Sequence, residues 1–144
     1  YERAMIPTLE EVYELLKPTG LTINVELKTG VVFYPEIEAR VLDLTARMGL
    51  EERVWYSSFN HYTVQRIKEL NPQAKTGMLY CDGIVNPVSY GALVVGADAM
   101  HPALYNLQYP NYMEDCKSTE SVCMSGRSTR SSTCAWCARC RWTL

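Results

Sequence analysis

Two charged side chains lie two positions apart at the end of an apolar, alternating segment. Glu26 and Lys28 close the run that begins at Leu21. In an extended strand, residues i and i+2 point to the same face, so the carboxylate and the ammonium are expected side by side. A carboxylate oxygen can bind a hard divalent cation, and a fixed ammonium can stabilise an anion. The pair could form part of a site, or it could be a solvated surface pair, as charges at strand ends commonly are.

Histidine and cysteine supply the other groups that could take part in catalysis or metal binding. His61 is expected on the surface of a helix, and His101 lies at the end of a predicted strand, where it could border a site. Four thiolates near the carboxyl terminus could hold zinc or an iron–sulfur cluster. The signal is weak, because a second closely spaced pair is missing. These cysteines are Cys123, Cys134, Cys137 and Cys140.

The elements that must position these groups alternate between helix and strand. Thr8 and Glu11 form a predicted capping box at a helix start, and Asn60 is a predicted N-cap. The expected order is helix 9–17, strand 21–27, helix 35–48, strand 54–59, helix 61–70, strand 76–80, helix 87–95, strand 97–100 and a helix opening at Asn111. Regular alternation with short connections predicts an α/β fold with a parallel sheet. Periodicity alone fits a small doubly wound sheet as well as half a barrel.

Length, composition and charge limit the possible classes. A chain of 144 residues is one domain or part of one, since a complete parallel barrel takes roughly 250 residues. No apolar run approaches the roughly 20 residues of a membrane span. The N-terminal residues show no basic region followed by an apolar core, so no signal peptide is expected. The chain starts at Tyr1 in mid-pattern, as a fragment would. Residues 1–116 carry 9 basic and 15 acidic side chains, which argues against a nucleic-acid partner. Nothing demands an oxidising compartment, so a cytoplasmic location is expected.

Four motifs resemble the glycerophosphodiester phosphodiesterase family. They are Ile-Pro-Thr-Leu-Glu-Glu-Val at 6–12, Asn-Val-Glu-Leu-Lys at 24–28, Ser-Ser-Phe-Asn at 57–60 and Gly-Ala-Asp-Ala-Met-His-Pro at 96–102. They resemble the family's IPTLEEV helix start, its NIEIK strand, its SSFN strand end and a late barrel strand. The motifs stand in order and at the family's spacing. The resemblance implies an incomplete TIM (β/α)8 barrel in residues 1–116, about four βα units from its C-terminal half, with the site at the carboxyl ends of the strands.

The resemblance also implies an activity and two site residues. The family hydrolyses glycerophosphodiesters, which are small molecules of lipid and glycerol metabolism, to glycerol 3-phosphate and an alcohol, and it uses a divalent metal. Glu26 matches a metal ligand for Mg²⁺ or Ca²⁺, and Lys28 matches a phosphate-contacting lysine. The family's His-Arg-Gly, Glu-x-Asp and His-Asp motifs are missing, and neither His61 nor His101 matches its acid/base histidines. This chain alone is therefore expected to be inactive, with the metal weakly bound or absent, because acid–base catalysis needs a positioned donor and acceptor.

Residues 117–144 change the composition abruptly. They carry 5 basic residues and 1 acidic residue, together with four of the six cysteines. One permitted reverse translation of residues 123–129, read from one base earlier, encodes VHVWTVN, which resembles the family's last strand, VWTVN. We interpret this segment as an irregular tail, read out of frame, that does not pack regularly on residues 1–116. The alternative is a non-catalytic binding domain with a Cys-rich, metal-binding tail.

Overall fold

A parallel five-stranded sheet forms the centre of the computed structural model, which describes residues 5–124. The strands are β1 (Ile23–Glu26), β2 (Val54–Ser58), β3 (Lys75–Tyr80), β4 (Ala99–Pro102) and β5 (Val122–Cys123). Each pairs in parallel with the next strand along the chain. A doubly wound sheet reverses its strand order at a switch point, whereas a barrel keeps the chain order. The order β1-β2-β3-β4-β5 is therefore that of an open part of a barrel.

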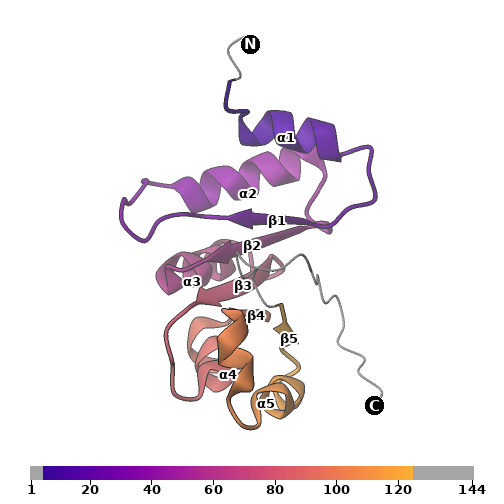
Figure 1. The fold of residues 1–144 in the computed structure, drawn as a ribbon. Coiled ribbons are helices and arrows are strands. Elements are labelled where there is room, and N and C mark those ends of the chain that lie inside the picture. The colour runs from indigo at the N-terminus through magenta and orange to yellow at the C-terminus, as the bar shows by residue number, and fades with distance from the viewer. Residues whose placement is uncertain (1–4, 125–144) are drawn as a thin grey trace.

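Helices connect the strands, as the alternation predicts. They are α1 (Leu9–Leu16), α2 (Ile37–Met48), α3 (His61–Leu70), α4 (Pro87–Ser89) with the π-helical continuation η1 (Tyr90–Val95), the 3-10 helix η2 (Leu104–Gln108) and α5 (Tyr112–Ser118). Figure 1 shows α1 and α2 beside β1 at one end of the sheet, with α4 and α5 beside β4 and β5 at the other. Among the described residues, none of the helices is long and apolar enough to cross a lipid bilayer.

The predicted helix caps are present. The Thr8 hydroxyl accepts the backbone N–H of Glu11 at 3.3 Å, and the Glu11 carboxylate accepts the Thr8 backbone N–H at 2.7 Å. The amide oxygen of Asn60 accepts the backbone N–H of Tyr62 at 3.2 Å. These contacts satisfy backbone donors that a helix start leaves without partners. Local sequence therefore sets where α1 and α3 begin. The start of α3 also fixes where the connection from β2 ends.

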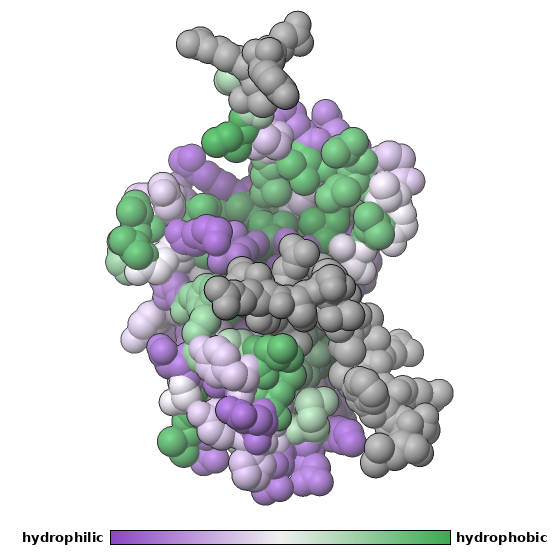
Figure 2. Space-filling view, in the orientation of Figure 1, coloured by the Kyte–Doolittle hydropathy of each residue, from purple (hydrophilic) through white to green (hydrophobic). Residues whose placement is uncertain are grey.

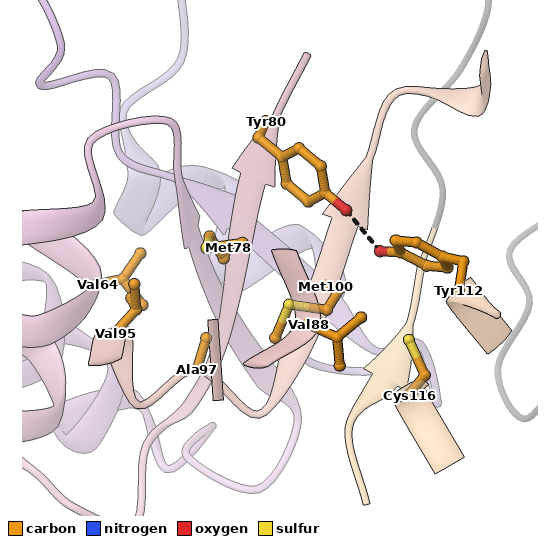
Figure 3. Packing of buried hydrophobic residues seen from close by; sticks show 9 residues of the cluster. All are labelled: Val64, Met78, Tyr80, Val88, Val95, Ala97, Met100, Tyr112 and Cys116. Atoms are coloured by element: carbon orange, nitrogen blue, oxygen red, sulfur yellow. Dashed lines mark hydrogen bonds between the residues drawn. The ribbon is translucent and has the colours of Figure 1, made fainter. Parts of the chain in front are cut away.

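Alternate strand residues on one side of the sheet pack beneath the helices in two clusters. One cluster joins β1 and β2 to α1 and α2, and the other joins β3 and β4 to α3, α4 and α5 (Figure 3). Because successive strand residues point to opposite faces, the intervening residues form the other face, here called the lumen face. One row on it runs through four paired residues: Glu26, Ser57, Gly77 and Ala99.

Residues 117–144 were expected to form an irregular tail, but regular structure extends into this segment as far as Cys123. Helix α5 continues to Ser118, and β5 pairs with β4 through Val122 N to Asp98 O at 3.0 Å and Met124 N to Met100 O at 2.8 Å. The open edge of β4 has backbone groups that need hydrogen-bond partners, and β5 supplies them. The sequence did not predict β5 because its two residues, Val122 and Cys123, are too few to show an alternating apolar pattern. Cys134, Cys137 and Cys140 lie outside the described residues, and the out-of-frame interpretation stays a prediction.

Candidate active site

Glu26 and Lys28 lie in contact at the carboxyl end of β1. The ammonium of Lys28 donates to Oε1 of Glu26 at 3.0 Å. Glu26 is the last residue of β1, and Leu27 extends the pairing by donating its N–H to the carbonyl of Ser57 at 2.8 Å. The Lys28 side chain is 80% exposed and that of Glu26 31%. The sequence-predicted juxtaposition is thus present at the edge where a parallel barrel carries its site.

Polar side chains from the Ser-Ser-Phe-Asn segment hold the backbone around Lys28. Ser58 donates its hydroxyl to the carbonyl of Leu27 at 2.6 Å, and the Asn60 amide donates to the carbonyl of Thr29 at 3.2 Å. The Thr29 hydroxyl lies 2.6 Å from that of Thr63 on α3. The segment on both sides of Lys28 is therefore fixed from β2 and α3. The sequence marked Ser58 as part of a family-like motif and Asn60 also as an N-cap, but their hydrogen bonds to the backbone beside Lys28 were not predicted.

An exposed apolar loop follows the charged pair. Val31, Val32, Phe33 and Tyr34, between β1 and α2, are all exposed. This loop, at the left in Figure 1, forms an apolar patch in Figure 2. None of these four side chains is charged. From the end of β1 to residue 34, the chain therefore contributes two charged groups, the carboxylate of Glu26 and the ammonium of Lys28.

His101 lies on the lumen face of β4, two residues beyond Ala99. Its side chain is buried, with 6% of the residue exposed, and burial lowers the pKa of its imidazole to about 4. A Cβ added at Gly77 on β3 would come within 2.5 Å of His101 Nε2, so the ring occupies the space that glycine leaves. A glycine inside a strand pattern is a sequence signal for such a close approach. The sequence indicated that His101 could border the site, but the role of Gly77 was not predicted.

Comparison with known proteins decides which family this geometry belongs to. No protein-family model matches the chain. The glycerophosphodiester phosphodiesterase of Caldanaerobacter subterraneus subsp. tengcongensis is 41% identical over 112 residues, which are 78% of this chain and 45% of that protein. A protein of the same name from Bacillus altitudinis is 36% identical over 98 residues, 67% of this chain and 40% of that protein. The chain belongs to the glycerophosphodiester phosphodiesterase family. It spans less than half the length of these two relatives.

Solved structures of phosphodiesterases show the same fold. A glycerophosphodiester phosphodiesterase from Parabacteroides distasonis superposes with a TM-score of 0.72 at 23% identity, covering 85% of this chain and 51% of that one. One from Agrobacterium tumefaciens gives 0.65 at 20% identity, covering 84% and 48%. The sequence-based predictions of family and of an incomplete TIM barrel are confirmed. Within residues 5–124, the sheet has five strands rather than the four expected.

His61, expected on the surface of a helix, lies half-buried at the start of α3. Its Nε2 lies 3.0 Å from the carbonyl of Leu79, and its Nδ1 lies 3.2 Å from the hydroxyl of Tyr90. A carbonyl only accepts, so Nε2 carries a proton, and in the neutral ring Nδ1 accepts from Tyr90. A position at the surface of α3 did not predict these contacts, because Leu79 on β3 and Tyr90 on η1 are distant in sequence. His61 ties α3 to its neighbours.

The described residues of this phosphodiesterase relative do not fit a divalent metal by themselves. Within residues 5–124, no group of three or more His, Cys, Asp or Glu side chains is placed to hold a metal ion. Ca²⁺ takes six to eight oxygen ligands and Mg²⁺ takes an octahedral set. Glu26 provides one carboxylate, and that carboxylate already pairs with Lys28. A metal here would need further ligands from outside the described residues.

Proposed function

We propose that this chain is the C-terminal half of a metal-dependent glycerophosphodiester phosphodiesterase. The observation that carries the proposal is the contact between Glu26 and Lys28 at the carboxyl edge of the sheet. A relative of the chain bears the name glycerophosphodiester phosphodiesterase. In the proposal, the substrate is a small glycerophosphodiester of lipid or glycerol metabolism. Its products are glycerol 3-phosphate and an alcohol.

Lys28 would bind the phosphate and Glu26 would be one ligand of Mg²⁺ or Ca²⁺. A lysine ammonium has three donors, so Lys28 can keep its bond to Glu26 and still donate to a phosphate oxygen. Its backbone is fixed from both sides, through Leu27 and Thr29, which reduces the ordering needed when the anion binds. The remaining metal ligands would come from the part of the barrel that this chain does not contain.

We further propose that the chain is inactive when it is alone. Acid–base catalysis needs a positioned donor and acceptor. Both ring nitrogens of His61 are engaged within the fold, and burial lowers the pKa of the His101 imidazole to about 4, which makes it a poor proton donor near pH 7. A cytoplasmic location and the lack of a nucleic-acid partner stay predictions. The binding-domain alternative rests on a tail whose cysteines lie mainly outside the described residues.

A fusion protein tests the proposal. The fusion joins this chain to all residues of the Caldanaerobacter relative that it does not match, and hydrolysis of glycerophosphocholine is followed with added Mg²⁺ or Ca²⁺. The chain alone should show no turnover above background, and the fusion should turn over. In the fusion, Glu26→Gln should nearly abolish activity, and Lys28→Ala should lower it by roughly 100-fold, as loss of a fixed charge-stabilising donor does.

A matched ion pair at the opposite edge of the sheet provides the control. Lys75 begins β3 and lies 3.2 Å from the Glu52 carboxylate. Glu52→Gln and Lys75→Ala should leave the activity of the fusion within about twofold, since surface pairs contribute little. Turnover by the chain alone, or equal losses from both pairs, would refute the proposed site.

A further inference from the structure

In the part of the chain that the structure describes, one buried histidine nitrogen has no hydrogen-bond partner. In residues 5–124, the buried side-chain polar atoms without a partner are Nε2 of His101 and Oδ1 of Asn106. The two residues belong to β4 and to η2, which follows it. Burying an unpaired polar atom is costly, and such atoms in a native fold call for an explanation. A ligand that supplies the missing partner is one explanation.

The ring of His101 lies in the same row as the charged pair. Glu26 is paired with Ser57, and Ser57 with Gly77, so two strand spacings separate Glu26 from Gly77. At about 4.8 Å per spacing, the distance is roughly 10 Å along the sheet. The imidazole occupies the space directly over Gly77. A small molecule of roughly this length, with its phosphate at Lys28, would reach the ring of His101.

The side of the sheet on which His101 lies follows from its neighbours. Met100 is buried in the cluster beneath the helices (Figure 3). His101 is the next residue and points to the opposite face, the lumen face, where its ring approaches Gly77. Glu26 shares this face, since the row of paired residues joins it to Gly77. The buried nitrogen without a partner and the charged pair thus lie on the same side of the sheet.

The chemistry of the group that fits His101 can be specified. Burial keeps the imidazole neutral near pH 7, because it lowers the pKa to about 4. A neutral ring lacks the charge that favours a phosphate oxygen. A hydroxyl group both donates and accepts, so it can pair with Nε2 in either tautomer. The glycerol portion of a glycerophosphodiester carries such hydroxyl groups.

We propose that Nε2 of His101 hydrogen-bonds a hydroxyl of the substrate's glycerol portion, which makes His101 a specificity-determining residue. The inference rests on the proposed function. His101 then selects glycerophosphodiesters over phosphodiesters that lack a hydroxyl at this position, because an apolar group there leaves the buried nitrogen without a partner. Gly77 is required for the same selection, since it provides the space for the ring.

Nuclear magnetic resonance of the 144-residue chain tests binding directly. The chain has two histidines, so ¹³C labelling at Cε1 gives two signals, assigned with His61→Gln and His101→Gln variants. The probes are glycerol, sn-glycerol 3-phosphate and inorganic phosphate. The His101 signal should shift with the two glycerol-containing probes, more than with inorganic phosphate, while the His61 signal stays in place. An equal shift with inorganic phosphate, or none with either glycerol probe, overturns the inference.

Kinetics in the fusion protein test selectivity. The ratio of kcat/KM for glycerophosphocholine to that for bis(4-nitrophenyl) phosphate should fall by about tenfold in His101→Leu, the loss expected for one neutral hydrogen bond. His101→Gln, which keeps a polar nitrogen near the position of Nε2, should recover part of the ratio. His61→Gln is the matched control and should not change the ratio, even if it lowers stability. An unchanged ratio in His101→Leu overturns the inference.

The two proposals fail in different ways. If the fusion hydrolyses neither substrate, the proposed function fails, and the resonance shift with glycerol alone still decides the role of His101. If the fusion is active and depends on Glu26 and Lys28, but the ratio of kcat/KM for the two substrates is unchanged in His101→Leu, the proposed function stands and the inference fails.

Discussion

The ammonium of Lys68 on α3 lies 2.8 Å from the carboxylate of Asp98, which directly precedes β4. The same carboxylate accepts the backbone N–H of Thr76 at 2.8 Å and its hydroxyl at 3.1 Å. Lys68 also donates to the carbonyl of Ala74 at 2.9 Å. Asp98 therefore joins α3, β3 and β4 at the amino edge of the sheet, away from the candidate site.

Removing this carboxylate should destabilise the fold. Asp98→Ala leaves Lys68 and the Thr76 N–H without their partner, and the expected loss is about 2 kcal/mol, as for hydrogen bonds to charged groups. The measurement is the free energy of unfolding in urea. Glu69→Ala, which removes the exposed partner of Arg66, is the control and should change stability by less than about 0.5 kcal/mol. Equal effects from the two variants would contradict this account.

A methyl group at Gly77 should clash with His101. A Cβ there would lie 2.5 Å from Cε1 and Nε2 of the ring, so Gly77→Ala is expected to cost about 1–3 kcal/mol, as overpacking does. Adding His101→Ala should recover much of this loss, which gives a coupling term in a double-mutant cycle. Gly20→Ala, with no atom within 4 Å of its Cβ, is the control. Strict additivity of the two changes would argue against the contact.

Stability should fall in acid because His101 is buried in its neutral form. The folded pKa is about 4 against an ordinary value of 6.5, so the unfolded chain takes up the proton first as the pH falls. The contribution of His101 is complete above about pH 6.5 and is lost as the pH falls from there to about 4. At pH 4.5 the loss is roughly 2–3 kcal/mol. Urea unfolding at several pH values should show this slope in the wild type and a shallower one in His101→Leu. Equal slopes in the wild type and in His101→Leu would show that His101 does not cause the loss of stability in acid.

Ser58 should matter for both stability and the position of Lys28. Its hydroxyl donates to Leu27 O at 2.6 Å and accepts the Asn60 N–H at 3.0 Å. Ser58→Ala removes one of two hydrogen bonds to the Leu27 carbonyl, which still accepts the Thr29 N–H at 3.1 Å, and it takes away the partner of the partly buried Asn60 N–H. The expected cost is about 1–3 kcal/mol. In the fusion, KM for glycerophosphocholine should also rise.

Ser89→Ala, at an exposed serine on α4, is the control for Ser58→Ala and should leave both stability and KM unchanged. A lowered stability with an unaltered KM would show that Ser58 supports the fold without positioning Lys28.

Local signals in the sequence were sufficient for much of this protein. The capping box at Thr8 and the N-cap at Asn60 depend on groups within three residues of each other, so they are readable from the chain. The alternation of helix and strand predicted a parallel sheet, and the strand period placed Glu26 beside Lys28. Each of these features arises from contacts that are near in sequence or from a simple repeat.

Tertiary structure decided what depends on distant partners. The strands lie in chain order, which identifies part of a barrel rather than a doubly wound sheet. Val122 pairs with the open edge of β4 and so forms β5. His61 was drawn into contact with Leu79, and the ring of His101 was seated over Gly77, 24 residues away in the sequence. Burial and hydrogen-bond satisfaction of a side chain depend on which strands lie beside it. No local period encodes that neighbourhood, so only the assembled sheet shows it.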